Sequence, residues 1–141
     1  MNSIIAGIKN WLSTERLLAI SLGVCYFWFG VLKFFPGASP AESLARETIN
    51  LLTLGLIPSD LSIFLLAIWE TSLGVLFMIN YVKKPVVLLA LVHIILTFSP
   101  MFLLPDLSFN GTAYLPTLLG QYIAKNFVFI SGFIILLKRA E

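Results

Sequence analysis

Long apolar stretches separated by short polar segments dominate the chain. They cover about 16–35, 61–82, 85–104 and 117–137. Because a helix needs about 20 mainly apolar residues to cross a bilayer, each stretch is long enough to span a membrane. The pattern predicts an all-α protein, an integral membrane four-helix bundle, with 1–141 forming a single transmembrane domain.

The fourth span has the least regular pattern. Phe127 to Leu137 is strongly apolar but only 11 residues long, so the helix must begin upstream, at Thr117 to Gln121, to reach spanning length. This start places Lys125 and Asn126 inside the span.

An amphipathic helix is predicted between the first two spans, over about 40–54. Ser39-Pro40-Ala41-Glu42 has the form of a capping box with proline at the first helical position, and Gly55 is expected to end the helix. Apolar side chains fall on one side and charged ones on the other. We therefore expect this helix to lie in the membrane interface or to cap the bundle.

The connecting segments carry further local signals. Met1 to Trp11 has apolar residues at helical spacing, which predicts a short surface helix. Ser59 or Asp60 is expected to cap the second span, and Ser99-Pro100 to kink the third near its end. Pro105 to Pro116 is rich in turn-forming residues and predicts a loop.

Composition agrees with a lipid environment and excludes several classes of function. Hydrophobic residues make up 59% of the chain and charged residues 11%, whereas soluble domains have about 25% charged residues. A net charge of +2 is too small to indicate a nucleic-acid partner, and the lone Cys25 cannot form an internal disulfide. The single histidine, His93, excludes haem ligation by two histidines of this chain, and no spacing of metal ligands is present.

Basic residues collect on one side of the predicted topology. With the N-terminus inside, the inner side receives six Lys and Arg residues and the outer side two, Lys33 and Arg46. The positive-inside rule then predicts both termini in the cytoplasm, for a protein of a bacterial inner membrane.

Three titratable residues lie inside the predicted spans. A charged residue at mid-bilayer costs about 2.5–3.5 kcal/mol on insertion scales, which makes such residues candidates for function. At about 1.5 Å of rise per residue, Glu70, His93 and Lys125 lie at similar depth, roughly 12–16 Å from the outer ends of their spans. We expect Glu70 and Lys125 to neutralise each other and His93 to complete the hydrogen bonds.

Neighbouring residues extend this layer into a candidate ligand-binding or proton-relay site. Gln121 lies one turn before Lys125, Tyr26 and Lys33 share a face of the first span, and Trp69 adds flat apolar surface. An aromatic-walled pocket with one acid and two bases is suited to a quinone or another planar, lipid-soluble ligand.

Structural roles are the alternative for each of these residues. A buried Glu–Lys pair can fix helix register, and His93 alone is typical of a hydrogen-bonded core histidine. Lys125 can extend to the outer interface if the fourth span begins as late as Gln121.

Several short motifs are spread over residues 15–137: Arg16-Leu17-Leu18, Gly23, Phe27 to Pro36, Ile68-Trp69-Glu70 with Gly74, His93, and Tyr122 to Asn126. Together they resemble the DoxX-like family of membrane proteins. The resemblance implies a four-helix bundle and carries over Lys33, Glu70, His93 and Lys125 as a polar set without a reaction. Some members of that family are subunits associated with quinol oxidase, thiosulfate:quinone oxidoreductase or oxidative-stress complexes. A distant branch includes an animal assembly chaperone for nicotinic receptors (NACHO).

Two functions follow as the main hypotheses. The first is an accessory or ligand-binding subunit linked to quinone redox chemistry. Because the chain carries no redox centre, the electrons would have to come from a partner redox protein or from the ligand. The second is an assembly chaperone or interaction protein, in which helix 40–54 docks a membrane partner and the polar layer is structural. A small-solute or proton transporter is a weaker third hypothesis, because no repeat or pair of broken helices is evident.

Overall fold

The structure is a computed structural model that describes residues 13–111 and 115–140, so the helix predicted over Met1 to Trp11 lies outside the described residues. Within the described part, four stretches are long and apolar enough to cross a membrane, which confirms the predicted fold class: Thr14–Leu32, Ser59–Met78, Lys84–Leu103 and Leu118–Ala140. The helices are α2 (Thr14–Leu32), α3 (Glu42–Leu52), α4 (Ser59–Met78), α5 (Lys84–Leu96), α6 (Pro100–Leu103), α7 (Pro105–Ser108), α8 (Leu118–Ala124) and α9 (Asn126–Ala140).

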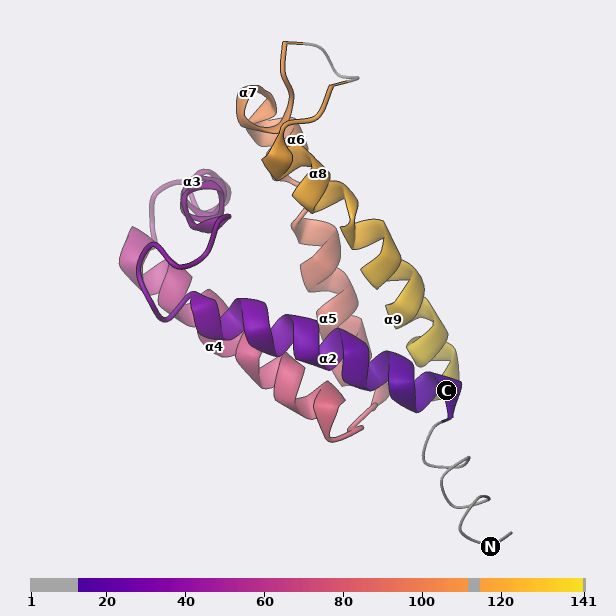
Figure 1. The fold of residues 1–141 in the computed structure, drawn as a ribbon. Coiled ribbons are helices and arrows are strands. Elements are labelled where there is room, and N and C mark those ends of the chain that lie inside the picture. The colour runs from indigo at the N-terminus through magenta and orange to yellow at the C-terminus, as the bar shows by residue number, and fades with distance from the viewer. Residues whose placement is uncertain (1–12, 112–114, 141) are drawn as a thin grey trace, which may run out of the picture.

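The long helices form two pairs (Figure 1). Helix α2 packs along α4, and α5 packs along α9. The two pairs converge near the C-terminal end of α9 and diverge toward the opposite end, where α3 lies beside the opening. The molecule is therefore a wedge, and its open end can hold a site.

Glycines bring α2 and α4 into backbone contact. A Cβ atom on Gly74 would lie 2.4 Å from the backbone nitrogen of Phe27, and one on Gly30 would lie 2.5 Å from that of Thr71. Small residues at such positions are what allows two membrane helices to approach closely. These glycine contacts allow α2 and α4 to pack closely along most of their length.

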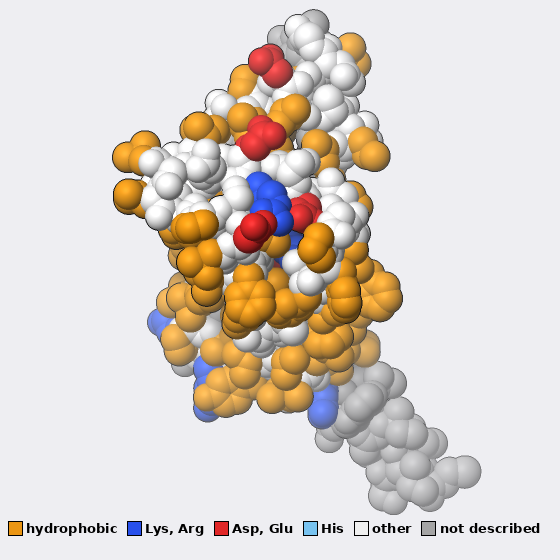
Figure 2. All heavy atoms as spheres, turned by 90° about the vertical axis from the view of Figure 1, so that its left-hand side faces the viewer, with side chains coloured by type: hydrophobic (Ala, Val, Ile, Leu, Met, Phe, Trp, Pro, Cys, Tyr) orange, Lys and Arg blue, Asp and Glu red, His pale blue; other side chains and the backbone are white. Residues whose placement is uncertain are grey.

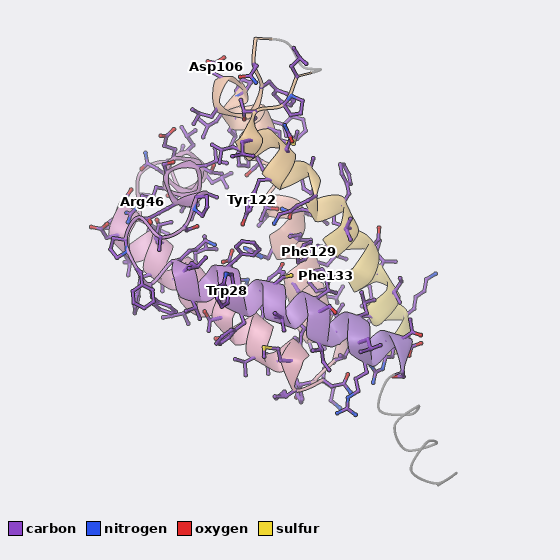
Figure 3. The ribbon with its side chains drawn as sticks, viewed as in Figure 1. Trp28, Arg46, Asp106, Tyr122, Phe129 and Phe133 are labelled. Atoms are coloured by element: carbon purple, nitrogen blue, oxygen red, sulfur yellow. The ribbon has the colours of Figure 1, made fainter. Side chains whose placement is uncertain are left out.

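Aromatic residues fill the closed end of the wedge. Phe77 and Phe133 are fully buried with ring centroids 5.3 Å apart, and Tyr26 packs edge-on against Phe133. Phe129 and Phe133 project from α9 toward α2 (Figure 3). Apolar side chains also cover the outside: Trp28, for example, is 64% exposed. Such a surface suits lipid rather than water, because the bilayer solvates apolar side chains.

On the face shown in Figure 2, a cluster of acidic and basic side chains lies in the upper half and basic side chains lie at the lower edge, with a mainly hydrophobic band between them. Lys83 and Lys84 precede or begin α5, and Lys138 and Arg139 form the last turn of α9. The opposite end carries Arg46 with its acidic neighbours. This distribution is that of an integral membrane protein.

The predicted capping box of the amphipathic helix is wrong. Helix α3 begins at Glu42, and the buried Ser39 hydroxyl makes no hydrogen bond. The Glu42 carboxylate instead accepts a hydrogen bond of 2.8 Å from the Gly37 backbone amide, so a turn forms in place of the cap. The C-terminal end of α3 is closer to the prediction. The helix ends at Leu52, and Gly55 follows it with a φ of +75°, a conformation that glycine adopts readily after a helix.

The spans also differ from the predictions in detail. The interruption expected at Ser99-Pro100 is present, since α5 ends at Leu96 and α6 begins at Pro100. The segment predicted as a loop from Pro105 to Pro116 begins with the short helix α7, because a proline can start a helix as well as end one. Neither Ser59 nor Asp60 caps the second span; both lie in the first turn of α4, after Pro58.

Candidate functional site

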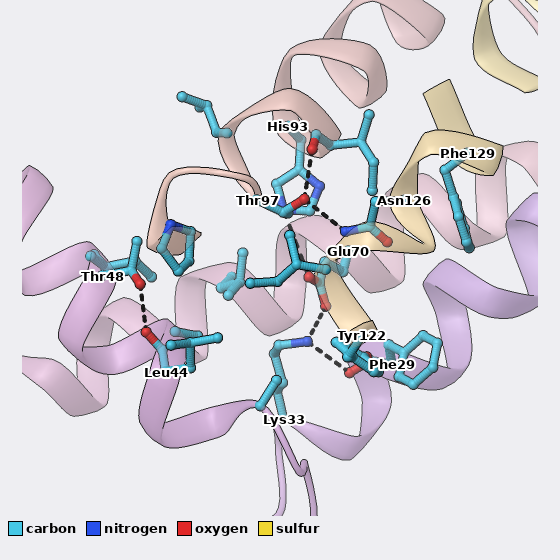
Figure 4. Close-up of a pocket in the computed structure, with 18 of the residues that line it drawn as sticks. Phe29, Lys33, Leu44, Thr48, Glu70, His93, Thr97, Tyr122, Asn126 and Phe129 are labelled. Carbon is cyan, nitrogen blue, oxygen red and sulfur yellow. Dashed lines mark hydrogen bonds and ion pairs between the residues drawn. The ribbon is translucent and has the colours of Figure 1, made fainter. Parts of the chain in front are cut away.

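The open end of the wedge contains a cavity of about 290 Å³. Helix α3 forms one wall, and residues of the two helix pairs form the others (Figure 4). Apolar side chains make most of the lining, including Leu44, Ile49, Leu66, Ile94 and Ile123. The structure brings five of the predicted site residues together in this lining: Tyr26, Lys33, Glu70, His93 and Lys125.

An ion pair between Lys33 and Glu70 is the most strongly charged contact of the cavity. Lys33 Nζ lies 2.6 Å from Glu70 Oε2, and the two side chains are only 7% and 11% exposed. Lys33 also donates a hydrogen bond of 3.2 Å to the carbonyl of Phe29. Because Lys33 directly follows α2 and Glu70 lies in α4, the close packing of these helices brings the two charges together.

The predicted pairing of Glu70 with Lys125 is therefore wrong. Rise per residue places both residues at a similar depth, and both do line the same cavity, but depth does not determine which helices are neighbours. Helix α4 packs on α2, so the carboxylate meets the α2 lysine first.

His93 connects the ion pair to Tyr26. Its Nδ1 lies 3.1 Å from the Tyr26 hydroxyl, and its Nε2 lies 3.7 Å from Glu70 Oε1. Tyr26 has one hydroxyl proton, which it can donate to Nδ1 or to the Ala90 carbonyl at 3.4 Å. Donation to Nδ1 places the proton of the neutral ring on Nε2, facing the carboxylate, whereas donation to Ala90 requires Nδ1–H and turns the Nε2 lone pair toward the carboxylate. The first arrangement avoids that repulsion, and in it Tyr26, His93, Glu70 and Lys33 form one polar row.

Lys125 occupies a separate position, within an aromatic cage. Its Nζ lies 3.8 Å from the ring centroid of Tyr122, 4.4 Å from that of Phe29 and 5.6 Å from that of Phe129. An ammonium over aromatic faces is stabilised by their negative quadrupole. This lysine separates α8 from α9 and is held inside the bundle rather than extended to the interface.

Two rings of this cage, Tyr122 and Phe129, and a polar link beside it were not among the predicted site residues. Tyr122 and Phe129 lie three residues before and four after Lys125, a spacing that places them on its helix face and could have indicated them. The Asn126 amide donates a hydrogen bond of 2.8 Å to the Thr97 hydroxyl and so joins α9 to the end of α5. Both residues of this link line the cavity.

Two predicted site residues do not line the cavity. Trp69 is 39% exposed on the outside of α4. Gln121 is exposed as well, and its amide donates to the carbonyl of Pro116. Trp69 directly precedes Glu70, so its side chain leaves α4 in a different direction. Gln121 lies one turn before Lys125, and its amide is directed to the start of α8.

A smaller polar hollow of about 180 Å³ adjoins the site. Lys33 lines both spaces, and Arg46 bridges Glu42 and Asp60 on the smaller one, with N–O distances of 2.8 and 2.7 Å. The Gly37 amide and then Arg46 hold the pKa of the Glu42 carboxyl below its usual value of 4.5. Charged groups thus lead from the surface shown in Figure 2 to the buried ion pair.

The arrangement offers hydrogen-bond donors and an acceptor to a ligand inside an apolar chamber. Among the described residues, no group of three or more His, Cys, Asp or Glu side chains could hold a metal ion. The chemistry available from the side chains is therefore hydrogen bonding, proton exchange and charge stabilisation.

Comparison of the chain with protein-family models, with curated proteins and with solved structures finds no match.

Proposed function

We propose that this protein is a membrane-embedded ligand-binding or accessory subunit linked to quinone redox chemistry, as its resemblance to DoxX-like proteins implies. The cavity would hold the ring of a quinone or of another planar, lipid-soluble molecule. One observation carries the proposal: an apolar, aromatic-walled cavity has the Lys33–Glu70 pair and His93 in its lining.

The size and lining of the cavity support a small ligand. Pockets for small molecules measure about 300–1,000 Å³ and are mostly apolar, with a few converging polar groups. At about 290 Å³, this cavity lies at the lower end of that range. It suits a ring head group whose hydrocarbon tail stays in the lipid.

The polar residues can bind both the oxidised form of such a ligand, a quinone, and its reduced form, a quinol. Quinone oxygens only accept hydrogen bonds, and the Lys33 ammonium and the Nε2–H of His93 are donors. Quinol hydroxyls also donate, and the Glu70 carboxylate accepts. Reduction of a quinone to a quinol takes two electrons and two protons; a partner redox protein would supply the electrons, and the polar row Tyr26–His93–Glu70–Lys33 would pass the protons.

Apolar residues at the cavity rim favour entry from the membrane. Leu52 of α3 and Leu96 of α5 both line the cavity and are 51% and 54% exposed. These exposed leucines give the cavity an apolar edge. A lipid-soluble ligand would reach the site past this edge without crossing the charged surface.

The charge distribution supports an orientation in the membrane. The end that carries Lys83, Lys84, Lys138 and Arg139 would face the cytoplasm of a bacterial inner membrane, by the positive-inside rule. Both described ends of the chain lie on that side.

Analysis of the purified protein tests the proposal. After purification in mild detergent, organic extracts should contain a quinone, and titration with a short-chain quinone should saturate a single site. Glu70→Gln should weaken binding about tenfold or more, while Glu47→Gln, on the exposed face of α3, should leave it unchanged. Ala45→Phe fills the cavity without changing a charge and should abolish binding.

An extract without quinone, together with no quinone binding in titration, would overturn the proposal. It would favour the alternative in which the chain assists the assembly of membrane partners and the Lys33–Glu70 pair only fixes the helices.

A further inference from the structure

The cavity contains more positive than negative charge. Three formally charged side chains line it: Lys33, Glu70 and Lys125. Lys33 and Glu70 lie 2.6 Å apart and compensate each other. Lys125 is left as the additional charge, and among the described residues no carboxylate forms an ion pair with it.

Aromatic rings compensate this ammonium only in part. A cation–π contact contributes about 0.5–2 kcal/mol, depending on solvation. A charge taken out of water into a low-dielectric site requires an opposite charge or several hydrogen bonds to offset the loss of hydration. Glu70 is the acidic residue of the cavity lining, and it already pairs with Lys33 at 2.6 Å.

Lys125 is also placed where a ligand would meet it. The Phe29 and Tyr122 rings pack edge to face with centroids 5.5 Å apart, and both line the cavity. Figure 4 shows them on the same side of the chamber as Lys33. A ligand ring that packs on this aromatic wall would bring an attached oxygen close to the ammonium.

We propose that the cavity selects ligands that carry a negative charge, with an ionised oxygen of the ligand paired to Lys125. The ligand class is a planar, lipid-soluble organic anion, such as a hydroxyquinone, a phenolate or an aromatic carboxylate. This inference rests on the proposed function only in that the ligand occupies the same cavity. Lys33, Glu70 and His93 bind the other polar atoms of the ligand, and Lys125 makes the cavity selective for ligands that carry a negative charge.

Matched pairs of ligands test the inference on the full-length protein in detergent. Lawsone, a hydroxynaphthoquinone that is ionised at neutral pH, is compared with menadione, an uncharged naphthoquinone. Naphthoate is compared with uncharged acetylnaphthalene, which gives the same contrast without a quinone. Dissociation constants are measured by isothermal titration calorimetry.

The expected result is a preference for each anion by about tenfold, or about 1.4 kcal/mol. Lys125→Met should remove this preference, because it weakens binding of each anion far more than binding of its uncharged counterpart, whereas Lys125→Arg should keep it. Lys138→Met, at the far end of α9, is the control for a general loss of positive charge and should behave as the unsubstituted protein.

Each other outcome has a defined meaning. Equal affinities for lawsone and menadione would overturn the inference and leave the quinone proposal standing. Binding of naphthoate without binding of either quinone would overturn the quinone proposal and support the inference. If Lys125→Met does not fold, an anion preference that persists in Lys125→Arg supports the inference, and its absence from the unsubstituted protein overturns it.

Discussion

At the scale of single residues, the two lysines that line the cavity have different partners. Lys33 contacts a carboxylate at 2.6 Å, whereas Lys125 contacts aromatic rings. The charge of Lys33 is compensated within the chain, and Lys125 is the lysine that we propose to pair with an anionic ligand. The surroundings of each lysine thus distinguish two residues of the same type in one cavity.

The buried ion pair leads to a prediction on stability. Glu70→Gln leaves the Lys33 ammonium without its carboxylate, and breaking a buried pair in this way costs about 3–5 kcal/mol. The double variant Lys33→Met with Glu70→Gln removes both charges, so its free energy of unfolding should fall by clearly less than the sum of the single losses. Unfolding curves in detergent measure all three variants, and strictly additive losses would contradict the direct pairing.

The turn before α3 leads to a prediction on pH dependence. Because the folded-state pKa of Glu42 lies below 4.5, its stabilising effect is fully present above that value and is lost as the pH falls through the folded pKa. The nitrogen and proton shifts of the Gly37 amide, recorded by NMR, should follow this titration with a midpoint below 4.5. In Glu42→Gln the titration should be absent; a transition that persists there would show that another group is responsible.

At the scale of helices, the contact between α2 and α4 determines the site. Glycines at positions 30 and 74 let the backbones touch, and that contact places Lys33 against Glu70. A wider separation of these helices would lengthen the ion pair and change the cavity wall. The close packing of this helix pair therefore sets the distance between Lys33 and Glu70.

Two glycine substitutions test this dependence. Gly74→Ala places a methyl group 2.4 Å from backbone nitrogen on α2, so the helices must separate, and we expect a loss of several kcal/mol in unfolding free energy. Gly132→Ala is the matched control, because its Cβ meets only leucine methyl groups, at 3.0 and 3.3 Å. Alanine favours a helix over glycine by about 1 kcal/mol, so the control should be close to neutral. Equal effects of the two substitutions would contradict the close backbone contact.

At the scale of the whole molecule, the two helix pairs form a wedge with one end closed by aromatic side chains and the other open beside α3. Acidic residues gather near the open end and basic residues near the closed end. The site consequently lies nearer to the side that we propose as outer, between a charged surface and an apolar rim.

The prediction at this scale concerns the orientation of the chain in the membrane. A reporter that is active only in the periplasm should be inactive when fused at residue 141 and active when inserted at Asp106, if the basic end is cytoplasmic. Exchange of Lys83 and Lys84 for glutamine should weaken this preference, since it removes two of the charges that determine orientation. Activity of the reporter at residue 141 in the unsubstituted protein would reverse the assignment.

Local patterns in the sequence were sufficient for the helices and for the depth of the polar residues. Hydrophobic length specified the spans, Pro100 predicted the break in the third one, and rise per residue placed Glu70 and His93 in one layer. The capping box at Ser39 was misread, because a competing contact to the Gly37 amide changes the local turn. Gly37 and Glu42 are only five residues apart, so the contact is a local one. The same residues also fit a capping box, however, and the sequence alone does not distinguish the two arrangements.

Only the tertiary structure decided which residues are partners. Hydrophobic periodicity is a property of one helix, whereas pairing depends on the rotation of each helix and on which helices are neighbours. The glycine contact of α2 with α4 assigned Glu70 to Lys33, and the position of α8 and α9 beside α2 surrounded Lys125 with rings. The sequence determined which polar residues lie within the long apolar stretches; the packing of helices determined which lysine pairs with a carboxylate and which lies among aromatic rings.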